Sequence, residues 1–220
     1  RRAHSRARRF FEALGGLLSA DLILCLVVDR SCDRHPLVPT VTAVVEAGVD
    51  WVQLRDRALP GADWLAWAKE IAEAARGAEI LVNRRVDVAL AIAAEGVHLG
   101  FDALGASQAA ALLPPGSRIG VSAHSAEQVR AAEAAGASYA QLAPIWDPVS
   151  KRPERPALGL EQLALACAGG LPVLAQGGVS ASRCPQLRDA GAAGVAVTGD
   201  LLLADDLGRA AQSLRAALDR

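Results

Sequence analysis

The strongest constraint on the fold is an alternation of short apolar runs with longer Ala- and Leu-rich stretches, repeated eight times between residues 22 and 218. The expected strands are Leu22–Val28, Trp51–Leu54, Glu79–Val82, Gly96–Leu99, Arg118–Val121, Tyr139–Leu142, Pro172–Ala175 and Gly194–Val197. The expected helices lie near 38–47, 62–76, 85–94, 105–113, 125–135, 159–168, 180–190 and 201–218. Near-continuous apolar strands that alternate with helices predict a parallel sheet covered by helices.

Eight strand–helix pairs in about 200 residues favour a closed barrel over an open, doubly wound sheet. An open sheet usually has fewer strands and a glycine-rich turn after the first one, whereas Asp29-Arg30-Ser31 follows the first run here. We therefore predict an α/β fold with one domain, a single (β/α)8 TIM barrel over residues 21–220. A short Arg-rich N-terminal extension, residues 1–20, precedes it.

Composition and charge narrow the expected partners. With 52% hydrophobic residues among 220, the chain can bury a full core, and its net charge of −1 gives no reason to expect nucleic acid. The arginines of the extension can bind RNA or lipid headgroups, but a solvated arm is the simpler interpretation. No apolar run approaches the roughly 18 residues of a membrane span. The four cysteines show no CxxC spacing, which predicts neither a disulfide nor a zinc site and favours the cytoplasm.

Two glycine-containing loops follow the last two expected strands. Gln176-Gly-Gly-Val179 comes after the seventh strand, and Thr198-Gly-Asp200 after the eighth. Glycine permits positive φ and lets an anion approach main-chain N–H groups. Barrels of this class often bind phosphate with these two loops. The pair predicts a phosphorylated small molecule as the ligand, although either glycine alone can simply end a strand.

Polar side chains follow the other strands, at the end where such barrels carry their catalytic groups. After the second strand, alternation puts Gln53, Arg55 and Arg57 on one side, and the two guanidiniums can clamp a phosphate. The alternative is an ion pair with Asp56 or another surface carboxylate. Asn83, after the third strand, can cap the next helix as well as hydrogen-bond a ligand, and the cap is the simpler explanation.

Candidate residues also follow the fourth, fifth and sixth strands. His98 lies within a strand and is expected to be a hydrogen-bonded core residue, and Asp102 is an isolated carboxylate, which makes a poor magnesium site. His124 stands at a loop-to-helix junction, where it either shuttles protons or is a surface or capping residue. Lys151 belongs to a long proline-containing loop that either covers an anionic substrate or is merely exposed.

Taken together, these segments resemble the thiamine phosphate synthase/TenI superfamily over about residues 22–218. The motifs are Gln53-Leu-Arg-Asp-Arg57, Val82-Asn-Arg-Arg-Val-Asp-Val-Ala89, Gly96-Val-His-Leu-Gly100, Gly120-Val-Ser-Ala-His-Ser125, Ala143-Pro-Ile-Trp-Asp-Pro-Val-Ser-Lys151 and Gln176-Gly-Gly-Val179. Each motif is loose, and their common order and spacing carry the resemblance.

The resemblance implies one of two chemistries. Thiamine phosphate synthases join a pyrimidine diphosphate to a thiazole phosphate with Mg2+ and release pyrophosphate, whereas the related thiazole tautomerases move a proton within a thiazole carboxylate phosphate. The positions that match the diphosphate and pyrimidine site are Gln53, Arg55, Asn83, Ser122 and Lys151. Gly178 and the Thr198-Gly199 turn match the thiazole-phosphate site.

Departures from the synthase pattern favour the tautomerase. That pattern has Asn-Asp after the third strand and an acidic residue after the fourth, and these carboxylates hold magnesium. Here Arg84 stands at the place of the first carboxylate, and Asp102 remains as a candidate for the second. A guanidinium repels Mg2+. Arg57 also replaces a lysine of the synthase pattern, and His124 matches the proposed proton shuttle of the tautomerases.

We therefore expect a metal-free thiazole tautomerase without a cofactor, in which His124 is the general acid/base. Phosphate would be bound by the amides of Gly177, Gly178 and Gly199, and the carboxylate by Arg55, Arg57 and Arg84. The first alternative is a thiamine phosphate synthase with Mg2+ recruited by Asp102, and the second is a barrel that binds such ligands without turnover. The expected partner is a small thiazole phosphate, with neither nucleic acid nor membrane, and a homodimer is compatible with this interpretation.

Overall fold

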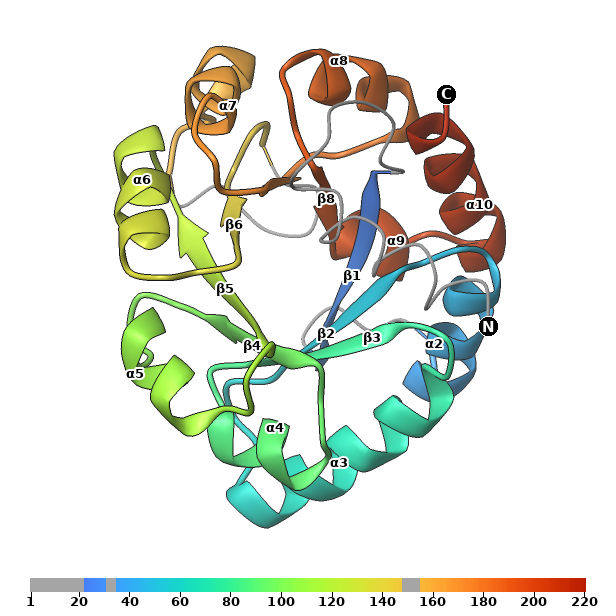
Figure 1. Cartoon of the computed structure of the whole chain (residues 1–220). Helices are drawn as coiled ribbons and strands as arrows, with labels where there is room; N and C mark the ends of the chain where they lie inside the picture. The colour runs from blue at the N-terminus through green and yellow to red at the C-terminus, as the bar shows by residue number, and fades with distance from the viewer. Residues whose placement is uncertain (1–21, 31–34, 148–154) are drawn as a thin grey trace.

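A computed structural model, which describes residues 22–30, 35–147 and 155–220, shows a closed barrel of eight parallel strands inside a ring of helices (Figure 1). The strands are β1 (Ile23–Asp29), β2 (Trp51–Arg55), β3 (Glu79–Asn83), β4 (Gly96–Leu99), β5 (Arg118–Ala123), β6 (Tyr139–Leu142), β7 (Val173–Gln176) and β8 (Gly194–Val197). Each strand pairs with its sequence neighbours, and β1 pairs with both β2 and β8. The predicted (β/α)8 barrel is confirmed.

The helices connect successive strands and cover the outside of the barrel (Figure 1). They are α2 (Leu37–Glu46), α3 (Gly61–Ala74), α4 (Val86–Ala91), α5 (Ala106–Leu112), α6 (Ala126–Ala134), α7 (Gly159–Cys167), the 3-10 turn η2 (Ala181–Arg183), α8 (Cys184–Asp189), α9 (Gly199–Leu202) and α10 (Leu207–Leu218). The predicted extension at residues 1–20 lies outside the described residues.

The last predicted helix, 201–218, is in fact two helices. α9 ends at Leu202, and α10 begins anew after Asp206, whose side-chain carboxylate accepts a hydrogen bond from the backbone N–H of Arg209 at 2.9 Å. A carboxylate at the N-cap satisfies a backbone donor that the first helical turn leaves unpaired, and it therefore fixes a new helix start.

Two layers of apolar side chains fill the molecule. The larger layer lies between strands and helices, as with Leu24, Val52 and Leu142, and the smaller one fills the barrel interior around Trp51 and Tyr139. The rings of Trp51 and Tyr139 meet edge to face, with centroids 5.1 Å apart. The barrel is therefore packed rather than open as a pore, and a binding site has to lie at one of its ends.

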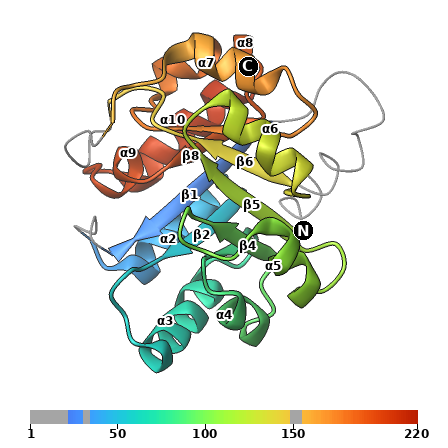
Figure 2. The same ribbon diagram turned by 90° about the vertical axis from the view of Figure 1, so that its left-hand side faces the viewer.

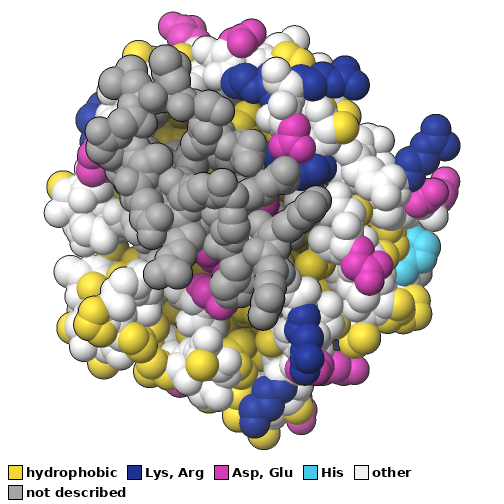
Figure 3. Space-filling model, turned by 45° about the vertical axis from the view of Figure 1, so that its right-hand side comes forward, with side chains coloured by type: hydrophobic (Ala, Val, Ile, Leu, Met, Phe, Trp, Pro, Cys, Tyr) yellow, Lys and Arg dark blue, Asp and Glu magenta, His cyan; other side chains and the backbone are white. Residues whose placement is uncertain are grey.

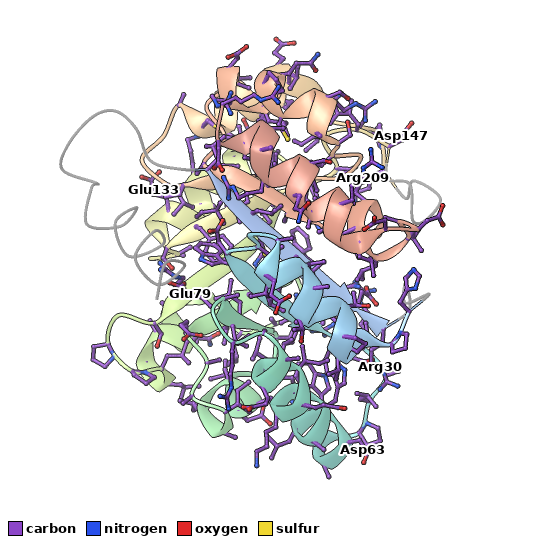
Figure 4. All side chains as sticks on the ribbon, turned by 90° about the vertical axis from the view of Figure 1, so that its right-hand side faces the viewer. Arg30, Asp63, Glu79, Glu133, Asp147 and Arg209 are labelled. Atoms are coloured by element: carbon purple, nitrogen blue, oxygen red, sulfur yellow. The ribbon has the colours of Figure 1, made fainter. Side chains whose placement is uncertain are left out.

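The two ends differ in character. Figure 4 places Arg30 and Asp147 at the end where the strands finish, and Glu79 and Glu133 at the opposite end. At that opposite end, Glu79 pairs with Arg118, whose guanidinium lies 5.0 Å from the Trp51 ring. In Figure 2, α9 stands at the end toward which β1 points. The strand-terminal end is where the predicted site residues would meet.

No helix in the described part of the chain is both long and apolar enough for a membrane span. On the face in Figure 3, basic and acidic side chains are interspersed among the described atoms. Of the described cysteines, Cys25 and Cys184 are buried and Cys167 is half-buried, and all three are free thiols. Burial raises the pKa of Cys167 and Cys184 to about 11, which keeps both thiols protonated at neutral pH. The location in the cytoplasm stays a prediction, and a homodimer stays compatible with the sequence.

Candidate functional site

A large pocket opens at the strand-terminal end of the barrel, with a volume of about 1190 Å³. Because parallel strands all finish at this end, residues far apart in sequence come together there. Most of the residues predicted from sequence line it, namely Arg55, Arg57, Asn83, Arg84, Asp102, Ser122, His124, Gly177, Thr198 and Gly199. Their predicted roles as ligand contacts stay predictions. Lys151 lies outside the described residues.

Gln53 and Gly178 are two predicted contacts that do not line the pocket. Gln53 is buried beneath it, where its Oε1 accepts a hydrogen bond from Nδ2 of Asn83 at 3.1 Å. Gln53 thus orients Asn83 from below instead of reaching the pocket. Asn83 does not cap α4, because the N-cap position of that helix belongs to Arg85.

The arginine pair at the end of β2 is divided between two environments. Arg55 is half-buried and forms an ion pair with Asp29 at the end of β1, whereas Arg57 is exposed. Asp56, which the sequence offered as a partner, instead accepts hydrogen bonds from the backbone N–H groups of Ala58 and Leu59, both at 2.7 Å. Asp56 therefore shapes the β2–α3 loop, and both guanidiniums remain at the pocket wall.

Arg84 stands immediately after β3 with φ of +67°, a left-handed conformation that residues other than glycine seldom adopt. Its backbone N–H donates to the carbonyl of His98 on β4 at 2.8 Å, which holds this conformation in place. Nη2 of Arg84 lies 2.5 Å from a carboxylate oxygen of Asp102. Arg84 therefore lines the pocket and pairs with Asp102, the acid that follows β4.

His124 lies at the pocket wall after β5. Its Nδ1 is 2.6 Å from the carbonyl oxygen of Ala143, so Nδ1 carries the proton and a neutral ring keeps Nε2 as an acceptor. The exposed ring of Phe101 stacks on it, with centroids 4.6 Å apart. This imidazole is a fixed part of the wall, and Ser125 rather than His124 caps α6.

Beside it, Ser122 links the pocket to the barrel interior. Its hydroxyl lies 2.9 Å from Nε2 of His98, whose Nδ1 is 3.1 Å from the hydroxyl of Tyr139. Burial, and secondarily the charge of Arg55, lowers the pKa of His98 to about 3, which keeps it neutral. His98 is the hydrogen-bonded core residue that the sequence predicts, and it holds Ser122 in place.

The glycine loops after β7 and β8 are shaped by close packing. Gly177 and Gly178 have φ of +96° and +59°, and a Cβ on Gly177 would lie 2.9 Å from Cβ of Pro144. Glycine is thus required by the approach of the β6 loop, whatever the ligand. After β8, Thr198 and Gly199 line the pocket together with Asp200. Burial raises the pKa of Asp200 to about 6.

Gln141 on β6 is a pocket residue that sequence reasoning missed. It is only 3% exposed, lines the pocket, and its Nε2 has no hydrogen-bond partner among the described residues. A buried donor without an acceptor is costly, so it suits a ligand acceptor. A glutamine inside the apolar run Tyr-Ala-Gln-Leu was the available signal.

A family model described as thiamine monophosphate synthase matches residues 24–201. The chain belongs to this family. Among its relatives, the thiamine-phosphate synthase of Mycobacterium bovis (strain BCG) is 39% identical over 216 residues, covering 92% of this chain and 96% of the relative. The thiamine-phosphate synthase of Methanoculleus marisnigri is 42% identical over 196 residues, covering 87% and 93%.

Solved structures agree with this membership. A thiamine phosphate pyrophosphorylase from Pyrococcus furiosus superposes with a TM-score of 0.80 at 29% identity, covering 90% of this chain and 96% of the other. A 3-hexulose-6-phosphate synthase, at 21% identity and a TM-score of 0.67, shares the fold alone.

These relatives correct the function expected from sequence. The tautomerase interpretation is wrong, since relatives 35–42% identical over most of the chain are named thiamine-phosphate synthases. Arg84 and His124 are single positions in two motifs, and the similarity along the whole chain outweighs them. The role of His124 as a proton shuttle falls with that interpretation.

Arg84 nevertheless conflicts with the magnesium site that the family resemblance implies after β3 and β4. Asp102, the carboxylate that remains as a candidate ligand there, is already paired with the Arg84 guanidinium. Within the described residues, no group of three His, Cys, Asp or Glu side chains is placed to hold a metal ion. The described residues after β3 and β4 therefore do not fit a carboxylate-held Mg2+ at this place.

Proposed function

We propose that this chain is a thiamine-phosphate synthase, an enzyme of thiamine biosynthesis that joins a pyrimidine diphosphate to a thiazole phosphate and releases pyrophosphate. The observation that carries the proposal is the similarity to thiamine-phosphate synthases at 39% and 42% identity over nine-tenths or so of the chain. The residues that match the family model, 24–201, contain all eight strands, except that β1 begins one residue earlier, at Ile23.

The size and charge of the pocket support a reaction between two phosphorylated substrates. Its volume of about 1190 Å³ exceeds that of typical single-ligand pockets, roughly 300–1,000 Å³. Arginines after β2 and β3 lie on one wall, and the glycine loops after β7 and β8 lie on another. Two separate anion-binding walls suit a diphosphate at the first and a monophosphate at the second.

The coupling reaction requires the pocket walls to stabilise the leaving group and to orient the two heterocycles. The C–O bond between the methylene carbon of the pyrimidine and its diphosphate breaks, and its electron pair leaves with pyrophosphate. The lone pair of the thiazole nitrogen forms the new C–N bond. Guanidiniums at Arg55, Arg57 and Arg84 would neutralise the charge that grows on the leaving group. The amides of Asn83 and Gln141, on β3 and β6, would orient the heterocycles.

The direct test is an assay of the purified chain with both substrates, with and without Mg2+. We expect thiamine phosphate and pyrophosphate in equal amounts. Arg57→Gln is expected to lower kcat/KM roughly tenfold or more, because a charge-assisted contact is lost. Arg130→Gln, an exposed arginine of α6 that pairs with Glu127, should leave kcat/KM unchanged. Absence of both products under all conditions would contradict the proposal, and thiazole-phosphate binding without turnover would identify a non-catalytic barrel.

A further inference from the structure

Three of the four aspartates described in the pocket lining have positive or hydrogen-bond-donating partners. The described lining contains five arginines and four aspartates: Arg30, Arg55, Arg57, Arg84, Arg155, Asp29, Asp56, Asp102 and Asp200. Asp29 pairs with Arg55, and Asp102 with Arg84. Asp56 accepts two backbone N–H groups, and Nε of Arg30 lies 3.8 Å from it. Asp29, Asp56 and Asp102 thus pair with arginines or backbone N–H groups, and no three His, Cys, Asp or Glu side chains of the described residues are placed to hold a metal ion.

Arg84 is the residue whose placement matters most, because it stands where the resemblance implies a magnesium ligand. Its side chain is 34% exposed and lines the pocket, so it faces the pocket solvent as well as Asp102. Its left-handed backbone is fixed by the hydrogen bond to the carbonyl of His98. A fixed backbone and a carboxylate partner hold the guanidinium in one place, so it is preorganised for an anion.

A guanidinium can take over the electrostatic task of a metal ion toward a diphosphate. It carries a permanent charge and five N–H donors in a planar fork that matches phosphate oxygens. Two further guanidiniums, on Arg55 and Arg57, line the same wall. A divalent cation beside Arg84 would instead meet like charge and a carboxylate that is already neutralised.

We propose that this chain binds the diphosphate of its substrate through the guanidinium of Arg84, with Arg55 and Arg57, and does not need a divalent cation for that binding. The inference rests on the proposed synthase function. In the reaction, the electron pair of the breaking C–O bond stays on the ester oxygen, which becomes a terminal oxygen of the leaving pyrophosphate, and Arg84 compensates that charge. The atoms and electrons balance without another reactant, because the thiazole nitrogen supplies the pair for the new C–N bond.

The test measures binding of inorganic pyrophosphate by calorimetry on the full chain, in EDTA and in Mg2+. We expect the wild type to bind in EDTA, with an affinity that Mg2+ changes by less than about threefold. Arg84→Asn should weaken binding at least about tenfold, the loss expected of one charge-assisted, bidentate contact. Asparagine tolerates left-handed φ better than arginine, so this variant is expected to fold. Arg85→Gln is the matched control, since the neighbouring Arg85 pairs with Asp87 outside the pocket lining and should leave the affinity unchanged.

A second variant tests whether a carboxylate in place of Arg84 creates a metal site. Arg84→Asp places a carboxylate next to Asp102, and we expect this variant to bind Mn2+, seen by paramagnetic resonance, and to bind pyrophosphate only with a divalent cation. Pyrophosphate binding by the wild type that requires Mg2+, or an Arg84→Asn affinity equal to that of the wild type, would overturn the inference.

The two proposals fail separately: turnover that depends strictly on Mg2+ overturns the inference alone, whereas metal-independent pyrophosphate binding without any coupling overturns the synthase proposal alone.

Discussion

Asp200, at the start of α9 beside the predicted phosphate loops, has an altered acidity whose effect on stability can be measured. Burial raises its pKa from 3.8 to about 6, so the folded chain holds this proton more tightly than the unfolded chain does. The free energy of unfolding therefore falls as pH rises from about 4 through 6, and above that range the full cost of burying the charged Asp200 carboxylate is present.

Asp200→Asn removes this charge and should raise the free energy of unfolding by roughly 1–2 kcal/mol near pH 7.5, but by little near pH 4. Urea denaturation at both pH values checks the difference. The exposed neighbour Asp205 provides the control, since Asp205→Asn should change neither value. An equal effect of Asp200→Asn at both pH values would show that burial of the charge is not the cause.

Gln141 is a second residue at which binding and stability are expected to oppose each other. Because its buried Nε2 has no partner among the described residues, Gln141→Leu should raise the free energy of unfolding by about 1 kcal/mol. If the amide donates to a substrate, the same variant raises KM roughly tenfold. Denaturation and steady-state kinetics measure the two effects. Gln186→Leu, at an exposed site of α8, is the control, and an unchanged KM in Gln141→Leu would remove the amide from the binding site.

At the scale of elements, the apolar runs were sufficient to locate every strand to within one or two residues. A strand buried on both faces needs a continuous apolar run, and such runs, bounded by polar residues and glycine, are visible in sequence. The end of α9 was not visible, because the break before α10 depends on one side-chain cap at Asp206. Local periodicity continues across such a break.

The site was predictable only in part for a similar reason. The sequence placed His124, Ser122 and the glycine loops at strand ends, which the barrel then brings together. It did not show which side chains pair across strands, such as Arg84 with Asp102, 18 positions apart, or Arg55 with Asp29. These pairs depend on backbone φ and strand register, which the residue order does not reveal.

α10 carries the prediction that belongs to this scale, because its packing on the barrel depends on a buried ion pair. Nη1 of Arg215 lies 2.8 Å from a carboxylate oxygen of Asp50, which also accepts the backbone N–H of Leu24, and Nη2 of Arg215 donates to the carbonyl of Leu22. The pair thus joins the C-terminal helix to the start of β1.

Arg215→Met should lower the free energy of unfolding by roughly 3–5 kcal/mol, because it leaves a buried carboxylate without its counter-charge. Arg209→Met, at an exposed position of the same helix, is the control and should cost under about 0.5 kcal/mol. In urea denaturation, the double variant Arg215→Met/Asp50→Asn should lose clearly less free energy of unfolding than the sum of the losses in the two single variants. Additive costs would mean that the two residues contribute independently.

At the scale of the whole molecule, the binding pocket lies at one end of the barrel, and the pairing of β1 with β8, which closes the barrel, begins at the other end. The pocket lies where the strands finish, whereas β8 and β1 first pair at the other end, where Ile23 is opposite Gly194. A Cβ on Gly194 would overlap the backbone oxygen of Ile23 and lie 2.7 Å from its Cβ. The closing strand pair therefore requires glycine for steric reasons, independently of any substrate.

Gly194→Ala should consequently lower the free energy of unfolding by about 3 kcal/mol through overpacking, while KM for either substrate stays unchanged wherever the variant is folded. Gly208→Ala is the matched change in α10, where the nearest atom to a new Cβ is 3.8 Å away, and it should be neutral or slightly stabilising. Thermal and urea unfolding, with kinetics measured below the transition, separate the two effects. A rise in KM as large as the loss of stability would show that closure at one end of the barrel controls the geometry of the pocket at the other.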